Sequence, residues 1–286
     1  MALASNALTT VAAVKTYMGS TSSTDDSLIE TLINNVSDQI ERWCDRVFVA
    51  QTFTEFLDAR GTRTIGVANS PIESVDLVAT GTRNSISVDS AVSSDLVATV
   101  AIEETQARLY RIQEDGTTTT VNLTFASYPT TALLAAQINS TAGYSATNSF
   151  NAPSYTLHRM GGRDTVDSTA NLTCAADAES EYRVDYDRGL VHLRADSFPR
   201  FQEDLRNNHF PNQFQGVLVR YTGGYSTLPN ALVQAAFVLV SQAYQGRDRD
   251  RSLASENIGD YSYTAFAPGT WGDTVIDLLA PFRKIR

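Results

Sequence analysis

The sequence predicts a mixed α+β protein, in which a small bundle of about four helices with a β-hairpin arm is interrupted by an antiparallel β-rich domain. Apolar residues recur at helical spacing near both ends of the chain, whereas residues 79–180 are rich in Thr, Ser and Ala and carry short strand-like runs. The 286 residues also suffice for about two domains. We therefore expect residues 1–79 and 181–286 to form one helical body with its hairpin, and residues 80–180 to form an inserted domain.

The helical body is predicted from apolar stripes and from the residues that begin and end each helix. Thr9 or Thr10 caps a short helix that ends at Gly19, and an acidic pair at 25–26 begins a longer one. Pro229 begins a third helix, and residues 271–279 form a short amphipathic fourth helix. The core of this body is predicted to contain Ile29, Ile33, Val36, Ile40, Trp43, Leu232, Ala236 and Leu239.

Strands are predicted wherever the apolar period changes to two. Outside the middle segment they cover residues 48–57 up to a turn at 58–61, residues 72–78, a hairpin at 182–193 and residues 217–221. Inside it they cover residues 86–88, 96–102, 108–113, 121–125 and 155–159, with one helix from Thr130 or Thr131 to Asn139. Gly161, Gly162 and the polar stretch that follows predict a loop.

Charge and composition exclude several classes of protein. The chain carries 22 basic and 32 acidic residues, a net charge of −10, whereas a protein that grips a phosphate backbone needs a basic face. No apolar run is long enough to cross a bilayer, and the N-terminus has no signal-peptide pattern. Two distant cysteines, Cys44 and Cys174, favour a reducing compartment, with one long-range bridge left open.

The sequence contains no strong catalytic motif and indicates no cofactor or metal site. The three histidines, His158, His192 and His209, are far apart and lack ligand spacing. Asp185 and Asp187 could form a carboxylate pair of the kind that hydrolases use, but a turn flanked by aspartates is the favoured interpretation. Nucleotide-binding glycine motifs and the serine-hydrolase elbow are absent from the sequence.

The order and spacing of motifs at the two ends of the chain is its most specific feature. The first part contains Leu8-Thr9-Thr10-Val11, Asp25-Asp26-Ser27-Leu28-Ile29, Trp43-Cys44-Asp45-Arg46-Val47-Phe48 and Asn69-Ser70-Pro71-Ile72. The last part contains Arg188-Gly189-Leu190-Val191-His192-Leu193, Val219-Arg220-Tyr221-Thr222-Gly223-Gly224, Pro229-Asn230-Ala231-Leu232 and Asn257-Ile258-Gly259-Asp260-Tyr261. Together these motifs resemble the head–tail connector (adaptor) proteins of long-tailed double-stranded DNA bacteriophages. The resemblance covers residues 1–79 and 181–286, whereas the middle segment is absent from the compact members of that family.

The resemblance implies a structural role in the virion, at the junction of head and tail. It implies a ring of identical subunits, commonly dodecameric, that assembles in the host cytoplasm and binds beneath the portal protein. A tail-side neck protein, either a stopper or a tail terminator, would attach to the ring. DNA would pass through the channel without sequence-specific binding, which an acidic subunit permits. The implied protein is not an enzyme and binds no membrane.

A loop rich in aromatic residues and a basic C-terminus are the candidate portal contacts. Aromatic side chains are common anchors at protein interfaces, and the C-terminus is the one local basic cluster in an acidic chain. A loop folded over its own helices is the equal alternative. The predicted contact residues are Ile258, Gly259, Asp260, Tyr261, Tyr263, Phe266, Arg283, Lys284 and Arg286.

A second functional hypothesis places a glycan-binding or receptor-binding module on the middle segment. Such a module would use an aromatic platform, and the aromatic residues of this segment are sparse. They are Tyr110, Phe125, Tyr128, Tyr144, Phe150 and Tyr155.

Overall fold

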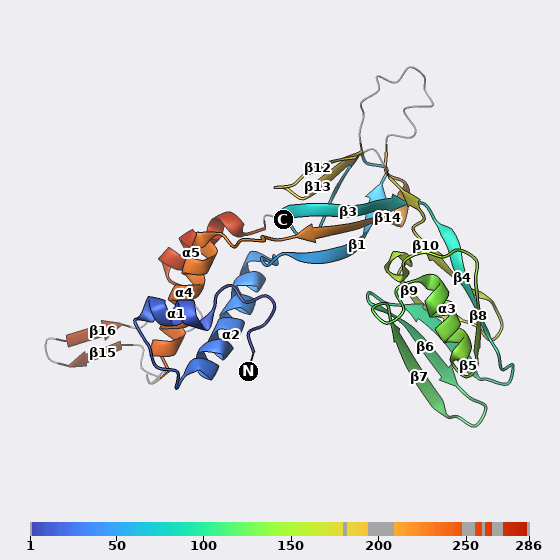
Figure 1. Ribbon diagram of the computed structural model, residues 1–286, viewed down its shortest axis with the longest axis horizontal. Helices are drawn as coiled ribbons and strands as arrows, with labels where there is room; N and C mark the ends of the chain where they lie inside the picture. The colour runs from blue at the N-terminus through green and yellow to red at the C-terminus, as the bar shows by residue number, and fades with distance from the viewer. Residues whose placement is uncertain are drawn as a thin grey trace, which may run out of the picture. The chain divides into compact units, whose positions relative to one another are not determined.

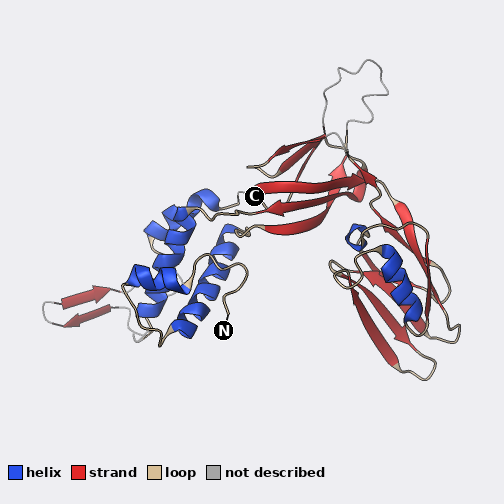
Figure 2. Cartoon of the chain, viewed as in Figure 1, coloured by secondary structure: helices blue, strands red, loops and turns tan. Residues whose placement is uncertain are grey.

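The computed structural model describes residues 2–179, 182–193, 209–247, 255–258, 261–264 and 271–284. Helices and antiparallel sheets occur together, which confirms the predicted mixed α+β class (Figures 1 and 2). The chain divides into two compact units. The helical unit contains Met1–Gln51, Asn69–Glu73 and Thr222–Arg286, and the β unit contains Thr52–Ala68 and Ser74–Tyr221.

The helical unit takes its helices from both ends of the chain. Its helices are α1 (Val11–Met18), α2 (Asp26–Cys44), α4 (Asn230–Gln245) and α5 (Asp273–Leu279), followed by a 3₁₀ turn, η2 (Ala280–Phe282). The side chain of Thr10 caps α1 by accepting a hydrogen bond from the Ala13 N–H group. Gly19 ends α1 with φ +68°, a conformation that costs glycine little because it has no Cβ. These boundaries follow the predicted ones closely.

One apolar cluster holds the helical unit together. It joins the buried face of α2 to that of α4, and α5 closes it through Val275 and Leu279. All eight residues predicted for the core lie here: seven are buried, and Trp43 packs against the cluster while half-buried. The side-chain amide of Asn69 bonds both backbone groups of Val47, at 2.9 and 3.1 Å, and so fixes the turn at 69–71 to the end of α2.

The β unit begins with a four-stranded sheet in the order β1-β14-β3-β11. Its strands are β1 (Gln51–Arg60), β3 (Ile72–Thr80), β11 (Asp177–Ala178) and β14 (Asn212–Gly223). The predicted turn at 58–61 is wrong for its first three residues, because β1 continues to Arg60 and turns only at Gly61. The strand predicted at 217–221 is likewise longer, because pairing within the sheet extends it back to Asn212.

The rest of the β unit encloses a second apolar core within residues 86–174. Two sheets contribute, β7-β6-β5-β9 and β10-β4-β8, and the helix α3 (Thr131–Ser140) packs against β8 (Figure 1). The strands are β4 (Arg83–Ser90), β5 (Val97–Ile102), β6 (Gln106–Ile112), β7 (Thr118–Thr124), β8 (Tyr144–Asn148), β9 (Met160–Asp164) and β10 (Ala170–Cys174). A small sheet in the order β12-β13-β2 completes the unit, with β2 at Thr64–Gly66, β12 at Tyr182–Asp185 and β13 at Leu190–Leu193.

Two expectations for this segment are wrong. The strand predicted at 155–159 is instead a 3₁₀ turn, η1 (Ser154–Thr156), followed by extended chain. The loop predicted from Gly161 onward contains the strands β9 and β10. Both strands pair with residues about 60 to 90 positions away, at β5 and β4, so local sequence carries little signal for them.

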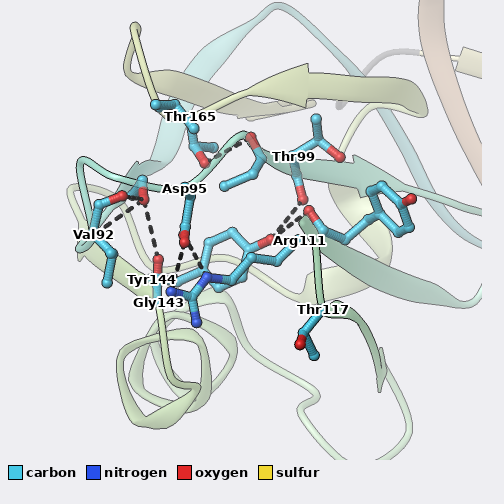
Figure 3. Close-up of polar contacts among 12 residues, drawn as sticks. Val92, Asp95, Thr99, Arg111, Thr117, Gly143, Tyr144 and Thr165 are labelled. Carbon is cyan, nitrogen blue, oxygen red and sulfur yellow. Dashed lines mark hydrogen bonds and ion pairs between the residues drawn. The ribbon is translucent and has the colours of Figure 1, made fainter. Parts of the chain in front are cut away.

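A buried ion pair crosses the interior of the β unit. The guanidinium group of Arg111 in β6 forms a bidentate pair with the carboxylate of Asp95, and one of the two contacts is a hydrogen bond of 2.7 Å. The Asp95 side chain is 1 % exposed and that of Arg111 is 12 % exposed. Figure 3 shows Tyr144 beside this pair, with its hydroxyl donating to the carbonyl groups of Tyr110 (2.8 Å) and Thr99 (3.2 Å). These contacts fix the loop before β5 against β6 and β8.

The observed division differs from the predicted boundaries at 79 and 181. Residues 52–68, 74–79 and 182–221, which were expected to belong to the helical body, group with the β unit instead. The reason is the sheet itself, since β3 pairs with β11 through Thr80 and Asp177 and thereby joins the predicted arm to the predicted insertion. Among the described residues, no helix combines the length and apolarity that a bilayer crossing requires.

Candidate functional site

The predicted contact residues of the C-terminal region are held by two different elements. Ile258, Tyr261 and Tyr263 lie on a pair of antiparallel strands, β15 (Ser255–Ile258) and β16 (Tyr261–Thr264), in which Ile258 pairs with Tyr261. The expectation of an aromatic loop is therefore wrong for these two stretches, because their backbones pair with each other. Gly259, Asp260, Phe266 and Arg286 lie outside the described residues.

The basic C-terminus is anchored on the helical unit. The Arg283 side chain is exposed, and its guanidinium carbon lies 5.3 Å from the centre of the Trp43 ring. The backbone N–H group of Lys284 donates a 2.9 Å hydrogen bond to the carbonyl of Cys44 at the end of α2. Nearby, the rings of Trp43 and Trp271 lie 5.5 Å apart. The fold thus places the Arg283 cation against Trp43, which in turn lies beside Trp271, at one end of α2.

The described residues hold no evident catalytic or metal-binding group. The carboxylate of Asp185 accepts the backbone N–H of Arg188, so it stabilises the turn between β12 and β13. His192 bonds the Thr64 hydroxyl at 2.7 Å, and His209 is exposed. No three His, Cys, Asp or Glu side chains within the described ranges lie close enough to share a metal ion.

His158 is the histidine with an unusual environment. The residue is 9 % exposed, and its ring centre lies 5.2 Å from that of Phe56. Nδ1 lies 3.2 Å from the Thr173 hydroxyl, whereas Nε2 has no partner among the described residues. Burial lowers the pKa of this imidazole below 6.5, and the adjacent Arg159 acts in the same direction. The ring is therefore neutral at pH 7.

Both cysteines are free and buried, so the long-range bridge that the sequence left open is not formed. Burial raises the pKa of the Cys44 thiol to about 11, and it raises that of Cys174 as well. A thiol that stays protonated at neutral pH is a poor nucleophile. The two side chains therefore act as small apolar residues.

Most aromatic residues of the middle segment are used inside the β unit rather than on its surface. Phe125 and Tyr144 are buried in its core, and Tyr128 and Phe150 pack against that core. Tyr155 lies beneath the guanidinium group of Arg220, 4.4 Å from it. Phe125 and Tyr155 also line a groove of the β unit.

A groove of about 1270 Å³ lies in the β unit beside β1. Aromatic side chains from three separate segments line it, among them Phe56, Phe125 and Tyr155. Its lining also includes the carboxylates of Glu55, Asp58, Glu103 and Glu104, and Arg159 is the one cationic residue among the described residues that line it. Sequence reasoning missed this groove because its residues come from positions 52 to 215 and are assembled only by the tertiary fold.

Part of the chain matches a known protein family. Residues 7–146 match the head completion protein family. The match covers α1 and α2 and continues past residue 79 into the segment that the sequence predicted as an insertion. No curated protein sequence matches this chain.

Three solved structures are similar to this chain at 14 % sequence identity, and each match covers 100 % of this chain. The neck of an empty gene transfer agent (GTA) particle computed with C6 symmetry has a TM-score of 0.44, with 94 % of its chain covered. The neck of a native GTA particle computed with C12 symmetry has a TM-score of 0.42, with 93 % covered. The virion of a native GTA particle has a TM-score of 0.43, with 94 % covered.

The relatives of this chain are therefore identified by the family match over residues 7–146. Residues 7–146 thus match the model of the head completion protein family, and this match confirms the resemblance to phage head–tail connector proteins.

Proposed function

We propose that this protein is a non-enzymatic structural adaptor in the neck of a phage or phage-like particle. The observation that carries the proposal is the match of residues 7–146 to the head completion protein family. The virion is its proposed location, at the junction between head and tail, after assembly in the host cytoplasm. Its proposed partners are the portal protein on the head side and a stopper or tail terminator on the tail side.

The working form is a ring of identical subunits through which DNA passes. A ring needs a head-to-tail contact that closes on itself, in which two different surfaces of the same chain meet. The net charge of −10 suits a DNA channel, because an acidic wall repels the phosphate backbone and lets the DNA slide. We expect the ring to form only on the portal, so that the free subunit stays monomeric.

We assign the portal contact to the strand pair β15–β16, to the neighbouring predicted residues and to the basic C-terminus. The exposed Arg283 and the adjacent Lys284 favour an acidic surface on the portal. The core residues of α2 and α4 act only by holding this surface in place.

Reconstitution with purified portal rings tests the proposal. The free protein should sediment as a monomer, and a mixture with portal rings should yield a two-tier ring in negative-stain images. A stable free dimer, or a failure to bind the portal, would overturn the adaptor role.

The contact assignment is tested separately with Arg283→Gln and Lys284→Gln together, which keep the backbone bond from Lys284 to Cys44. The pair should weaken portal binding, whereas the control Arg188→Gln, an exposed arginine of the β12–β13 turn, should not. Unchanged binding by the double variant would reject the contact while leaving the adaptor role intact.

A further inference from the structure

The strand β1 is an edge strand of its sheet. In the order β1-β14-β3-β11, β1 is the terminal strand, and no described strand pairs with its other side. It is ten residues long, and most of its residues are exposed or half-buried. A long open edge presents unpaired N–H and C=O groups that can pair with an added strand.

The groove beside β1 offers sites for the side chains of such a strand. Phe56 faces Arg159, whose guanidinium carbon lies 5.1 Å from the centre of the Phe56 ring. On the alternate face of β1, Phe53 stacks on Tyr221 at 5.4 Å. Because side chains alternate along a strand, a segment added to β1 would place its residues in turn against these two aromatic surfaces.

The charge of the groove determines which charge the added segment should carry. Four carboxylates line it, against the single guanidinium group of Arg159. Some of them have internal partners: Glu55 accepts the Tyr221 hydroxyl and the Ala68 N–H, and Glu103 pairs with Arg108 at 2.8 Å. Asp58 accepts the Gln215 N–H, and the exposed Glu104 lies close enough to Arg159 for the two charges to attract. The surplus of negative charge favours Lys or Arg side chains and disfavours acidic segments or nucleic acid.

We propose that β1 and its groove form a docking site for an extended basic segment of a partner protein, which adds to the sheet as a strand beside β1. Backbone hydrogen bonds to the edge supply part of the affinity, and the groove carboxylates supply selectivity for cationic side chains. This site lies in the β unit and involves none of the residues assigned to the portal contact, so it can be tested apart from the adaptor role.

The probe is a labelled synthetic peptide of about ten residues that alternates Val and Lys, titrated into the full-length protein by fluorescence anisotropy. We expect saturable binding, and amide chemical-shift changes confined to β1 and the groove. The same peptide with alternate backbone nitrogens methylated should bind at least about tenfold more weakly, because it cannot pair with a strand edge. A Val–Glu peptide should not bind.

A matched pair of variants locates the site. Glu104→Lys should weaken binding of the Val–Lys peptide about tenfold, whereas Glu114→Lys, an exposed glutamate in the β6–β7 turn outside the groove, should leave it unchanged. Equal binding of the methylated peptide would overturn the strand addition, and equal binding by the Glu104→Lys variant would overturn the assignment to this groove. A dimer of the free protein that the peptide dissociates would show that a second copy occupies the edge, and it would overturn the proposed partner.

Discussion

The hydroxyl of Tyr244 in α4 donates a 2.5 Å hydrogen bond to the carboxylate of Asp25 at the start of α2, across 219 positions of sequence. Arg247 reaches the same carboxylate at 3.2 Å. The Tyr244 bond is the main cause of a lowered pKa of Asp25, and Arg247 adds to the effect. This contact ties the last turn of one long helix to the first turn of the other.

Replacing Tyr244 with Phe should lower the melting temperature at pH 7 and raise the pKa of Asp25. A carboxyl whose folded-state pKa is lowered contributes stability above its ordinary value of 3.8, and this contribution is lost as the pH falls. The difference between the variant and the wild type should therefore shrink at a pH well below 3.8. NMR titration of Asp25 and melting curves at both pH values check this. Tyr17→Phe, at an exposed tyrosine of α1, serves as the control.

Shortening Ile33 should destabilise the helical unit strongly. Ile33 is fully buried in the cluster that joins α2 and α4, so Ile33→Ala leaves a cavity and should cost about 2–5 kcal/mol. Leu28→Ala, on the partly exposed side of the same helix, should cost well under half as much. Both tryptophans, Trp43 and Trp271, belong to the helical unit, so urea denaturation followed by tryptophan fluorescence reports on this unit alone. Equal losses for the two variants would contradict the assigned core.

Breaking the Asp95–Arg111 pair should destabilise the β unit. Asp95→Ala leaves the Arg111 charge buried without its partner, which should cost about 3–5 kcal/mol. The double variant with Arg111→Met should recover part of this loss, because no buried charge remains. An exposed pair is the control: Glu103→Gln, which removes the ion pair with Arg108, should cost at most about 1 kcal/mol. Circular dichroism of the strand signal during denaturation measures all three variants.

His158 should make the stability of the β unit depend on pH between about 5 and 7. Because burial lowers its pKa in the folded state, the unfolded chain takes up a proton at higher pH than the folded protein does. Stability is therefore fully present above the ordinary value of 6.5 and is lost as the pH falls through the lower folded value. His158→Gln should flatten the curve of melting temperature against pH in this range. His209→Gln, at an exposed histidine, should leave the curve as it is.

The sequence by itself determined the helices and which of them pack together. α1, α2 and α4 were predicted nearly residue by residue, because caps such as Thr10 and Gly19 and an apolar stripe every three to four residues are local signals. The buried face of α2 also identified the core that α4 completes. The motifs at the two ends indicated a likeness to phage head–tail connectors, and the match of residues 7–146 to the head completion protein family supports that likeness.

Only the tertiary structure decided how the strands are shared and where the groove lies. β9 and β10 have weak local patterns and exist because β5 and β4 pair with them. The same kind of long-range pairing joins the predicted arm to the β unit, and it brings Phe56, Glu104 and Arg159 to one groove. A strand forms its backbone hydrogen bonds with a neighbour that can lie anywhere in the chain, whereas a helix forms them between residues four positions apart. The helices can therefore be predicted from local sequence, and the sheets cannot.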